Sequence, residues 1–172
     1  MKTIIKLVSV IAIVAFCNNV SAQNQKLAHI SFNELIVSMS EYDSAMVKLQ
    51  KHTQELELTM EEMQVEWNKK LEDFNKNQAN WTDLVKQSKN DDLMTLRQRI
   101  ETFQQNAQES TQQEYDKLMQ PVIEKANKAI EAVAKEQGIT YVISDNSQIL
   151  HFKAVGTIDL LPSVKKHLGI NK

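Results

Sequence analysis

The four histidines are the side chains in this sequence best suited to metal binding or acid–base chemistry. His29, His52, His151 and His167 lie far apart, and none is followed by a second histidine at metal-ligand spacing. His29 and His151 fall in predicted strands and could be neighbours, as a metal site or an acid–base pair. The simpler interpretation is that both histidines are ordinary strand residues on the polar face of the sheet. Because the three glycines are also too scattered for a phosphate loop, we predict no catalytic residues, no metal, no cofactor and no enzymatic activity.

The methionines could indicate copper binding, since the chain has seven of them. Met39, Met46, Met60 and Met63, however, recur at helical spacing. Methionine is adaptable and polarizable, so it packs between helices or forms a soft binding surface. The spacing therefore predicts a helix seam or a binding surface.

The N-terminal segment predicts export from the cytoplasm. Two lysines precede the apolar run Leu7–Phe16, and small residues at Val20 and Ala22 precede Gln23. This is the pattern of a signal peptide over residues 1–22, cleaved after Ala22. A membrane anchor is the alternative, but the run is shorter than the roughly 20 residues that span a bilayer. Cys17, the only cysteine, would leave with the signal peptide, which excludes disulfides and thiol chemistry.

The charge is modest and unevenly distributed. Without the signal peptide, 18 basic residues face 22 acidic ones, a net charge of −4. This balance argues against nucleic acid or an anionic membrane as the main partner. Residues 41–74 carry nine acids and four bases, whereas residues 75–100 carry three acids and five bases.

The centre of the chain predicts two long helices. Residues 33–137 contain no glycine and one proline, and apolar or tolerant positions recur at alternating steps of four and three, the pattern of a helix packed along another helix. These positions are Tyr42, Met46, Leu49, Thr53, Leu56, Met60, Met63, Trp67, Leu71 and Phe74, and, after a gap, Leu93, Leu96, Ile100, Phe103, Ala107, Leu118 and Val122. The gap contains the polar stretches 75–81 and 86–92, and "NDDL" resembles a helix start. We predict an antiparallel helical hairpin over residues 41–120 with its tip near 78–91. One unbroken helix of about 100 residues is the alternative.

Pro121 marks the predicted junction between the arm and the rest of the chain. Proline lacks an N–H group and clashes with the preceding helical turn. It therefore predicts either a kink that acts as a hinge or the first residue of a new helix.

Both ends of the chain predict short strands that form a small body, residues 23–40 and 121–172. Ala28, Ile30 and Phe32 alternate within Lys26–Phe32, Tyr141–Ile143 is continuously apolar, and Ile149–Ala154 follows after a polar turn. We predict a hairpin of the last two, with Tyr141–Ile143 as a central strand, and a short helix over Ile158–Ile170 interrupted at Pro162. The fold class is α+β, mainly α, with a β-rich body. A sheet this small needs cover for its edges, which predicts self-association.

Two segments carry a family resemblance. "FNELIVSMSEYDSAMVKLQK" (residues 32–51) and "KLMQPVIEKANKAIEAVAKEQGITYVIS" (residues 117–144) resemble the Skp (OmpH-like) family of periplasmic chaperones. The resemblance implies a jellyfish-shaped homotrimer in the periplasm. Its helical arms would enclose a cavity that holds unfolded outer-membrane β-barrel proteins without ATP. The best-known members are basic and this chain is acidic, so we expect mainly apolar capture. The acidic balance also argues against lipopolysaccharide or membrane contact.

This interpretation assigns two groups of candidate residues. Client binding is predicted for Met46, Leu56, Met60, Met63, Trp67, Phe74, Trp81, Leu96 and Phe103. Oligomerisation is predicted for Ile30, Tyr141, Val142, Ile143, Leu150 and Phe152. The alternative function is a periplasmic coiled-coil scaffold that binds one partner tightly.

Overall fold

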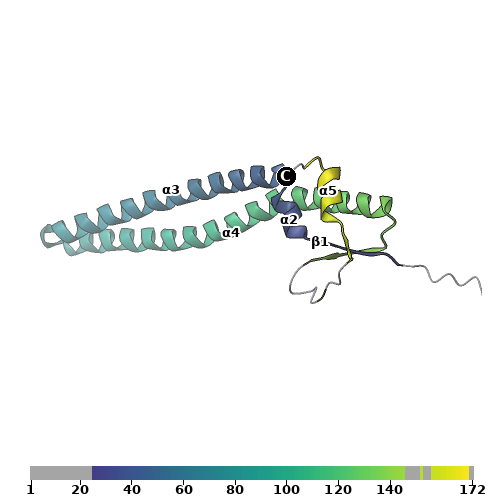
Figure 1. Ribbon diagram of the computed structural model, residues 1–172. Helices are drawn as coiled ribbons and strands as arrows, with labels where there is room; N and C mark the ends of the chain where they lie inside the picture. The colour runs from purple at the N-terminus through teal and green to yellow at the C-terminus, as the bar shows by residue number, and fades with distance from the viewer. Residues whose placement is uncertain (1–24, 146–151, 153–155, 171–172) are drawn as a thin grey trace, which may run out of the picture.

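A computed structural model of the protein describes residues 25–145, 152 and 156–170. Its elements are β1 (Leu27–Ile30), α2 (Phe32–Val37), α3 (Ser40–Asn77), the 3₁₀ turn η2 (Gln78–Asn80), α4 (Asp83–Glu136), β2 (Tyr141–Ser144), β3 (Ile158–Asp159) and α5 (Leu161–His167). In Figure 1, α3 and α4 lie side by side as a long arm, which projects from a small body. The predicted fold, mainly helical with a small sheet, is confirmed. The predicted signal peptide lies outside the described residues.

The arm reverses direction in a short turn at its far end. Residues 78–80 form η2, and Thr82 caps the start of α4, its side-chain oxygen accepting a hydrogen bond from the Val85 N–H at 3.4 Å. The antiparallel hairpin is thereby confirmed over the single long helix. The second half of the predicted tip, residues 83–91, is wrong, and so is a helix start at "NDDL". A threonine cap followed by an acidic residue in the first turn begins the helix eight residues earlier.

Pro121 lies inside α4 and does not restart the helix. Figure 1 shows α4 curving as it passes from the arm into the body. Proline leaves the Lys117 carbonyl, four residues earlier, without its helical donor. Because Pro121 is exposed, water can supply that donor, and the helix continues.

The sheet is parallel, with strand order β2-β1-β3. The expectation that Tyr141–Ile143 forms the central strand is wrong, because β1 lies between the other two. The β1 residues Ala28, His29 and Ile30 are all buried, as a central strand requires, whereas Tyr141 and Ile143 at the edge are partly exposed. The second strand of the predicted hairpin, residues 149–154, lies outside the described residues except for Phe152, which is 81% exposed and not in a strand.

The body core joins the sheet to three helices. Its fully buried side chains include Leu35 on α2 and Val164 on α5. The small side chains of Ala126 and Ala129 allow the other elements of the body to pack closely against α4. The body is less β-rich than predicted, since its strands contain only four, four and two residues. The predicted last helix also differs, because residues 158–159 form β3 and Pro162 lies in the first turn of α5.

Glycine ends α4 and α5 in the same way. At the end of α4, Gly138 has a φ of 65°, its N–H bonds the Lys135 carbonyl at 3.2 Å, and the Ile139 N–H bonds the Ala134 carbonyl at 2.9 Å. Gly169 ends α5 with a φ of 73° and equivalent bonds. A positive φ favours glycine, and this Schellman arrangement satisfies the last carbonyls of the helix. At Gly138 it turns the chain back into β2.

Candidate functional site

The arm is held together by a seam that is only partly buried. The predicted seam positions of α3, from Tyr42 to Phe74, are all half-buried. On α4, Leu93 and Leu96 are buried, whereas Ile100, Phe103 and Ala107 are half-buried. The alternation of four and three residues therefore predicted correctly which side chains face the partner helix. Incomplete burial means that these side chains keep apolar surface open to solvent.

The middle of the seam is polar. His52 Nε2 lies 3.0 Å from Ser110 Oγ across the two helices. Thr53 and Thr111, one position further along each helix, donate their hydroxyls to backbone carbonyls of their own helices. These side chains bring few apolar contacts, so the middle of the arm has little to resist separation of its helices.

The nine residues predicted to bind clients lie at the seam and the turn rather than on the open surface. Leu96 is buried and the other eight are half-buried. Trp81 packs edge-on against Phe74, with ring centroids 5.8 Å apart, and the Lys89 ammonium lies 5.7 Å from its ring. Trp67 buries its indole N–H without a hydrogen-bond partner. The arm therefore places these residues along one line, where most of them are partly accessible to solvent.

Sequence reasoning missed the apolar side chains on the outside of the arm. Val47, Leu58 and Val65 on α3 are 67%, 61% and 44% exposed, and Leu84 and Met94 on α4 are also exposed. The α3 residues are separated by eleven and seven positions, which places them on one stripe of a helix with 3.6 residues per turn. The more continuous seam obscured this signal, although the spacing was available in the sequence.

The predicted oligomerisation residues divide between the body core and its surface. Ile30 is buried within the chain's own core and Val142 packs against that core. Tyr141 and Ile143 are 54% and 36% exposed, Phe152 is also exposed, and Leu150 lies outside the described residues. Parallel pairing of Leu27 with Tyr141 places both on the sheet face opposite Ala28 and Ile30. The same face carries His29, which pairs with Ile143 and is buried. Apolar surface is therefore exposed on this face at Leu27, Tyr141 and Ile143 and not throughout.

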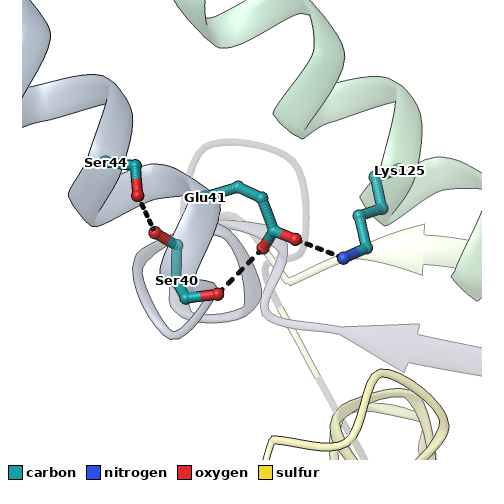
Figure 2. Close-up of polar contacts among 4 residues, drawn as sticks. All are labelled: Ser40, Glu41, Ser44 and Lys125. Carbon is teal, nitrogen blue, oxygen red and sulfur yellow. Dashed lines mark hydrogen bonds and ion pairs between the residues drawn. The ribbon is translucent and has the colours of Figure 1, made fainter.

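An ion pair links the two arm helices at their base. In Figure 2, Lys125 on α4 donates a hydrogen bond to the carboxylate of Glu41 on α3. The Ser40 hydroxyl also donates to this carboxylate, at 3.4 Å, and the Ser44 hydroxyl donates to the Ser40 carbonyl at 3.0 Å. The hydrogen bond from Lys125 lowers the pKa of Glu41, assisted by the backbone.

Replacing Glu41 by glutamine should weaken the base of the arm in a pH-dependent way. Because the pair is partly exposed, we expect a loss of no more than about 1 kcal/mol in unfolding free energy at neutral pH. The folded-state pKa lies below the ordinary value of 4.5. The stabilisation is therefore present above that value and is lost as pH falls through the folded-state pKa.

Urea unfolding followed by circular dichroism, at pH 7 and at about pH 3, measures this difference. A double-mutant cycle with Lys125→Met isolates the pair. If Glu41→Gln destabilises the protein equally with and without Lys125, the ion pair makes no contribution.

Within the described residues, no group of three or more His, Cys, Asp or Glu side chains could hold a metal ion. His29 was expected to face solvent, and this is wrong: it is 7% exposed, with Nδ1 3.6 Å from an Asp145 carboxylate oxygen. The central position of β1 is the reason. His151, its proposed neighbour, lies outside the described residues. Among the described helices, none is long and apolar enough to cross a membrane.

Comparisons with known proteins support a single family. The family model described as outer membrane protein (OmpH-like) matches residues 26–168. A crystal structure of a candidate outer membrane chaperone (OmpH-like) from Caulobacter crescentus superposes with a TM-score of 0.72 at 12% identity, covering 84% of this chain and 83% of that one. No curated relative matches the chain significantly. The family match extends from β1 to the end of α5, and the chain therefore belongs to the OmpH-like family.

Proposed function

We propose that the protein is a periplasmic holdase chaperone that works without ATP. It binds unfolded outer-membrane β-barrel proteins in a cavity between helical arms and prevents their aggregation. One observation carries the proposal: the arm is long and its apolar seam is only half-buried. Membership of the OmpH-like family and the likeness to the Caulobacter crescentus chaperone candidate support it.

The arm suits the capture of varied unfolded chains. Half-buried methionine, leucine and aromatic side chains such as Met60 and Phe103 offer many weak contacts that adapt to different clients. Exposed apolar residues on α3, among them Leu58, extend this surface. Separation of client chains by the arms would block pairing of their strand edges. Release of the client needs no ATP hydrolysis, because a client that has folded into the membrane no longer has affinity for the arm.

We propose that the body assembles as a homotrimer through the open face of the sheet. Parallel sheets are normally covered on both faces, and here Leu27, Tyr141 and Ile143 are partly exposed among the described residues. A second and a third copy would cover them and would place three arms around one space.

The same proposal includes the compartment of the protein and the absence of a cofactor or catalytic activity. The chain is exported by the segment that ends at Ala22 and acts in the periplasm. It needs no cofactor or metal, has no catalytic activity and does not bind nucleic acid. Contact with lipopolysaccharide or membrane is not expected, given the acidic charge balance.

A periplasmic coiled-coil scaffold is the second candidate. The aligned stripe of Val47, Leu58 and Val65 favours it, since a single helix of one partner could lie along that line. A scaffold should bind that partner tightly and with fixed stoichiometry. A holdase should bind several unrelated unfolded chains.

The deciding experiment is an aggregation assay. A urea-unfolded β-barrel protein is diluted with and without the mature chain, and light scattering is followed, with sedimentation velocity on the same mixture. The holdase proposal expects suppressed scattering and a soluble complex for more than one unrelated β-barrel protein. Unchanged scattering with every such client would refute it.

Client binding should change tryptophan fluorescence and should resist salt. Trp67 and Trp81, the only tryptophans, lie at the seam and the arm turn, where a bound client alters their surroundings. Because capture is mainly apolar, we expect affinity to fall less than about threefold between 0.05 and 0.3 M NaCl, a range that screens exposed charges. Fluorescence titration at both salt concentrations measures it. A steep loss would instead show that charged residues govern capture, such as Lys76, Lys86 and Lys89.

A further inference from the structure

The two sides of the arm carry different grooves. The groove on one side, about 640 Å³ in volume, is called the acidic groove below. Its lining residues are Thr53, Leu56, Glu57, Met60, Glu61 and Gln64 on α3 and Gln104, Ala107, Gln108 and Thr111 on α4. The groove on the other side, lined in part by Met63, Arg99 and Phe103, contains an arginine. Of these two grooves, the acidic groove is the one that combines an apolar floor with a negative edge.

The acidic groove exists because α4 contributes a small side chain at this level. Ala107 is the α4 seam residue beside Leu56 and Met60, and all three are half-buried. A larger residue at position 107 would fill the space between the helices. The volume lies within the range of about 300–1,000 Å³ typical of ligand sites, so the groove has room for large apolar side chains.

Two carboxylates on its edge have no partner within the described residues. Glu57 and Glu61 are one helical turn apart on α3, both exposed, and neither accepts a hydrogen bond or forms an ion pair there. Residues 52–68 contain five glutamates and no lysine or arginine. The uncompensated charge therefore favours a cation at the edge of the groove.

We propose that the acidic groove binds an extended polypeptide segment in which a large apolar side chain is flanked by lysine or arginine. The apolar side chain enters the space between Leu56, Met60 and Ala107, and the cationic side chains bind Glu57 and Glu61. An arginine can meet a carboxylate through two parallel hydrogen bonds, which adds geometric selection to charge. The inference rests on the proposed holdase function and names the client segments selected by the middle of the arm.

A labelled peptide of alternating lysine and phenylalanine tests the groove directly. Its binding to the full mature protein is measured by fluorescence anisotropy. In the test variant, Glu57→Gln is combined with Glu61→Gln. The control combines Glu55→Gln with Glu62→Gln, which removes the same charge from the same helix outside the groove. We expect about a tenfold weaker affinity in the test variant, from two exposed ion pairs, and less than a twofold change in the control.

Two further measurements separate the groove from a general charge effect. Ala107→Leu should also weaken peptide binding, because it fills the apolar space without changing the charge. A peptide with glutamate in place of lysine should bind weakly to the wild-type protein and gain affinity in the Glu57→Gln, Glu61→Gln variant.

The outcomes separate failure of this inference from failure of the holdase proposal. Equal losses in the test and control variants would show that the overall field of α3 is responsible. A change of oligomeric state in the test variant, seen by sedimentation, would assign the groove to contact between copies of the chain. Peptide affinity unchanged in the test variant, while the wild type still suppresses β-barrel aggregation, rejects the groove and keeps the holdase. Unsuppressed aggregation together with the expected peptide results rejects the holdase and leaves a peptide-binding groove.

Discussion

Removal of the outer arm should abolish protection of unfolded clients and leave the body assembled. The change deletes residues 56–107 and joins Glu55 to Gln108 through a short Gly-Ser linker, which leaves the His52–Ser110 contact near the new tip. The residues of the body core lie within 28–45 and 119–164, so the deletion removes none of them. Loop closure costs grow slowly with length, and the linker itself should not unfold the body.

Light scattering of a diluted β-barrel client and sedimentation of the shortened protein measure the two halves of this expectation. We expect scattering as high as without any chaperone, together with an unchanged oligomeric state. Full protection by the shortened protein would place client binding in the body. Conversion to monomers would mean that the arms hold the assembly together, and would favour the scaffold alternative.

Ile143→Asp should convert the assembled protein to monomers. Ile143 is 36% exposed in one chain and shares the open sheet face with Leu27 and Tyr141. An aspartate there can remain hydrated in a monomer, whereas association through this face would bury its charge without a partner, at a cost of several kcal/mol. Sedimentation velocity at micromolar concentration should then show a single slow species with a native helical circular dichroism spectrum.

Val47→Asp is the matched control for this experiment. Val47 is 67% exposed on the arm and is remote in sequence from the sheet, so its replacement should leave the oligomeric state unchanged. An Ile143→Asp protein that remains fully trimeric would contradict assembly through the open sheet face.

The arm could be predicted because the residues that pair its two helices recur at short, regular spacing along each helix. Alternating steps of four and three residues identify the side of each helix that faces its partner, and the positions from Tyr42 to Phe74 are half-buried as expected. The ends of a helix are determined by fewer residues than the face that packs against its partner. The cap at Thr82 consists of one side chain and one backbone N–H, too small a signal to outweigh the polar stretch that follows it.

Strand order was not predictable in the same way. Tyr141–Ile143 is the more continuously apolar segment, yet β1 occupies the centre because its neighbours come from elsewhere in the chain. Such pairing depends on contacts between distant residues, which periodicity does not report. The acidic groove was missed for a similar reason, since Ala107 leaves a space only in relation to Leu56 and Met60 on the other helix.

The central position of β1 also sets an order of events in folding. Leu27 pairs with Tyr141, 114 positions further along the chain, and Ala28 pairs with Ile158. The sheet therefore cannot begin to form until nearly the whole polypeptide is present, whereas the two arm helices meet through a turn of a few residues. Contacts that are close in sequence form faster than distant ones. The two arm helices should consequently pair first, starting at the turn. Their pairing brings the two ends of the chain together, so that the sheet can form.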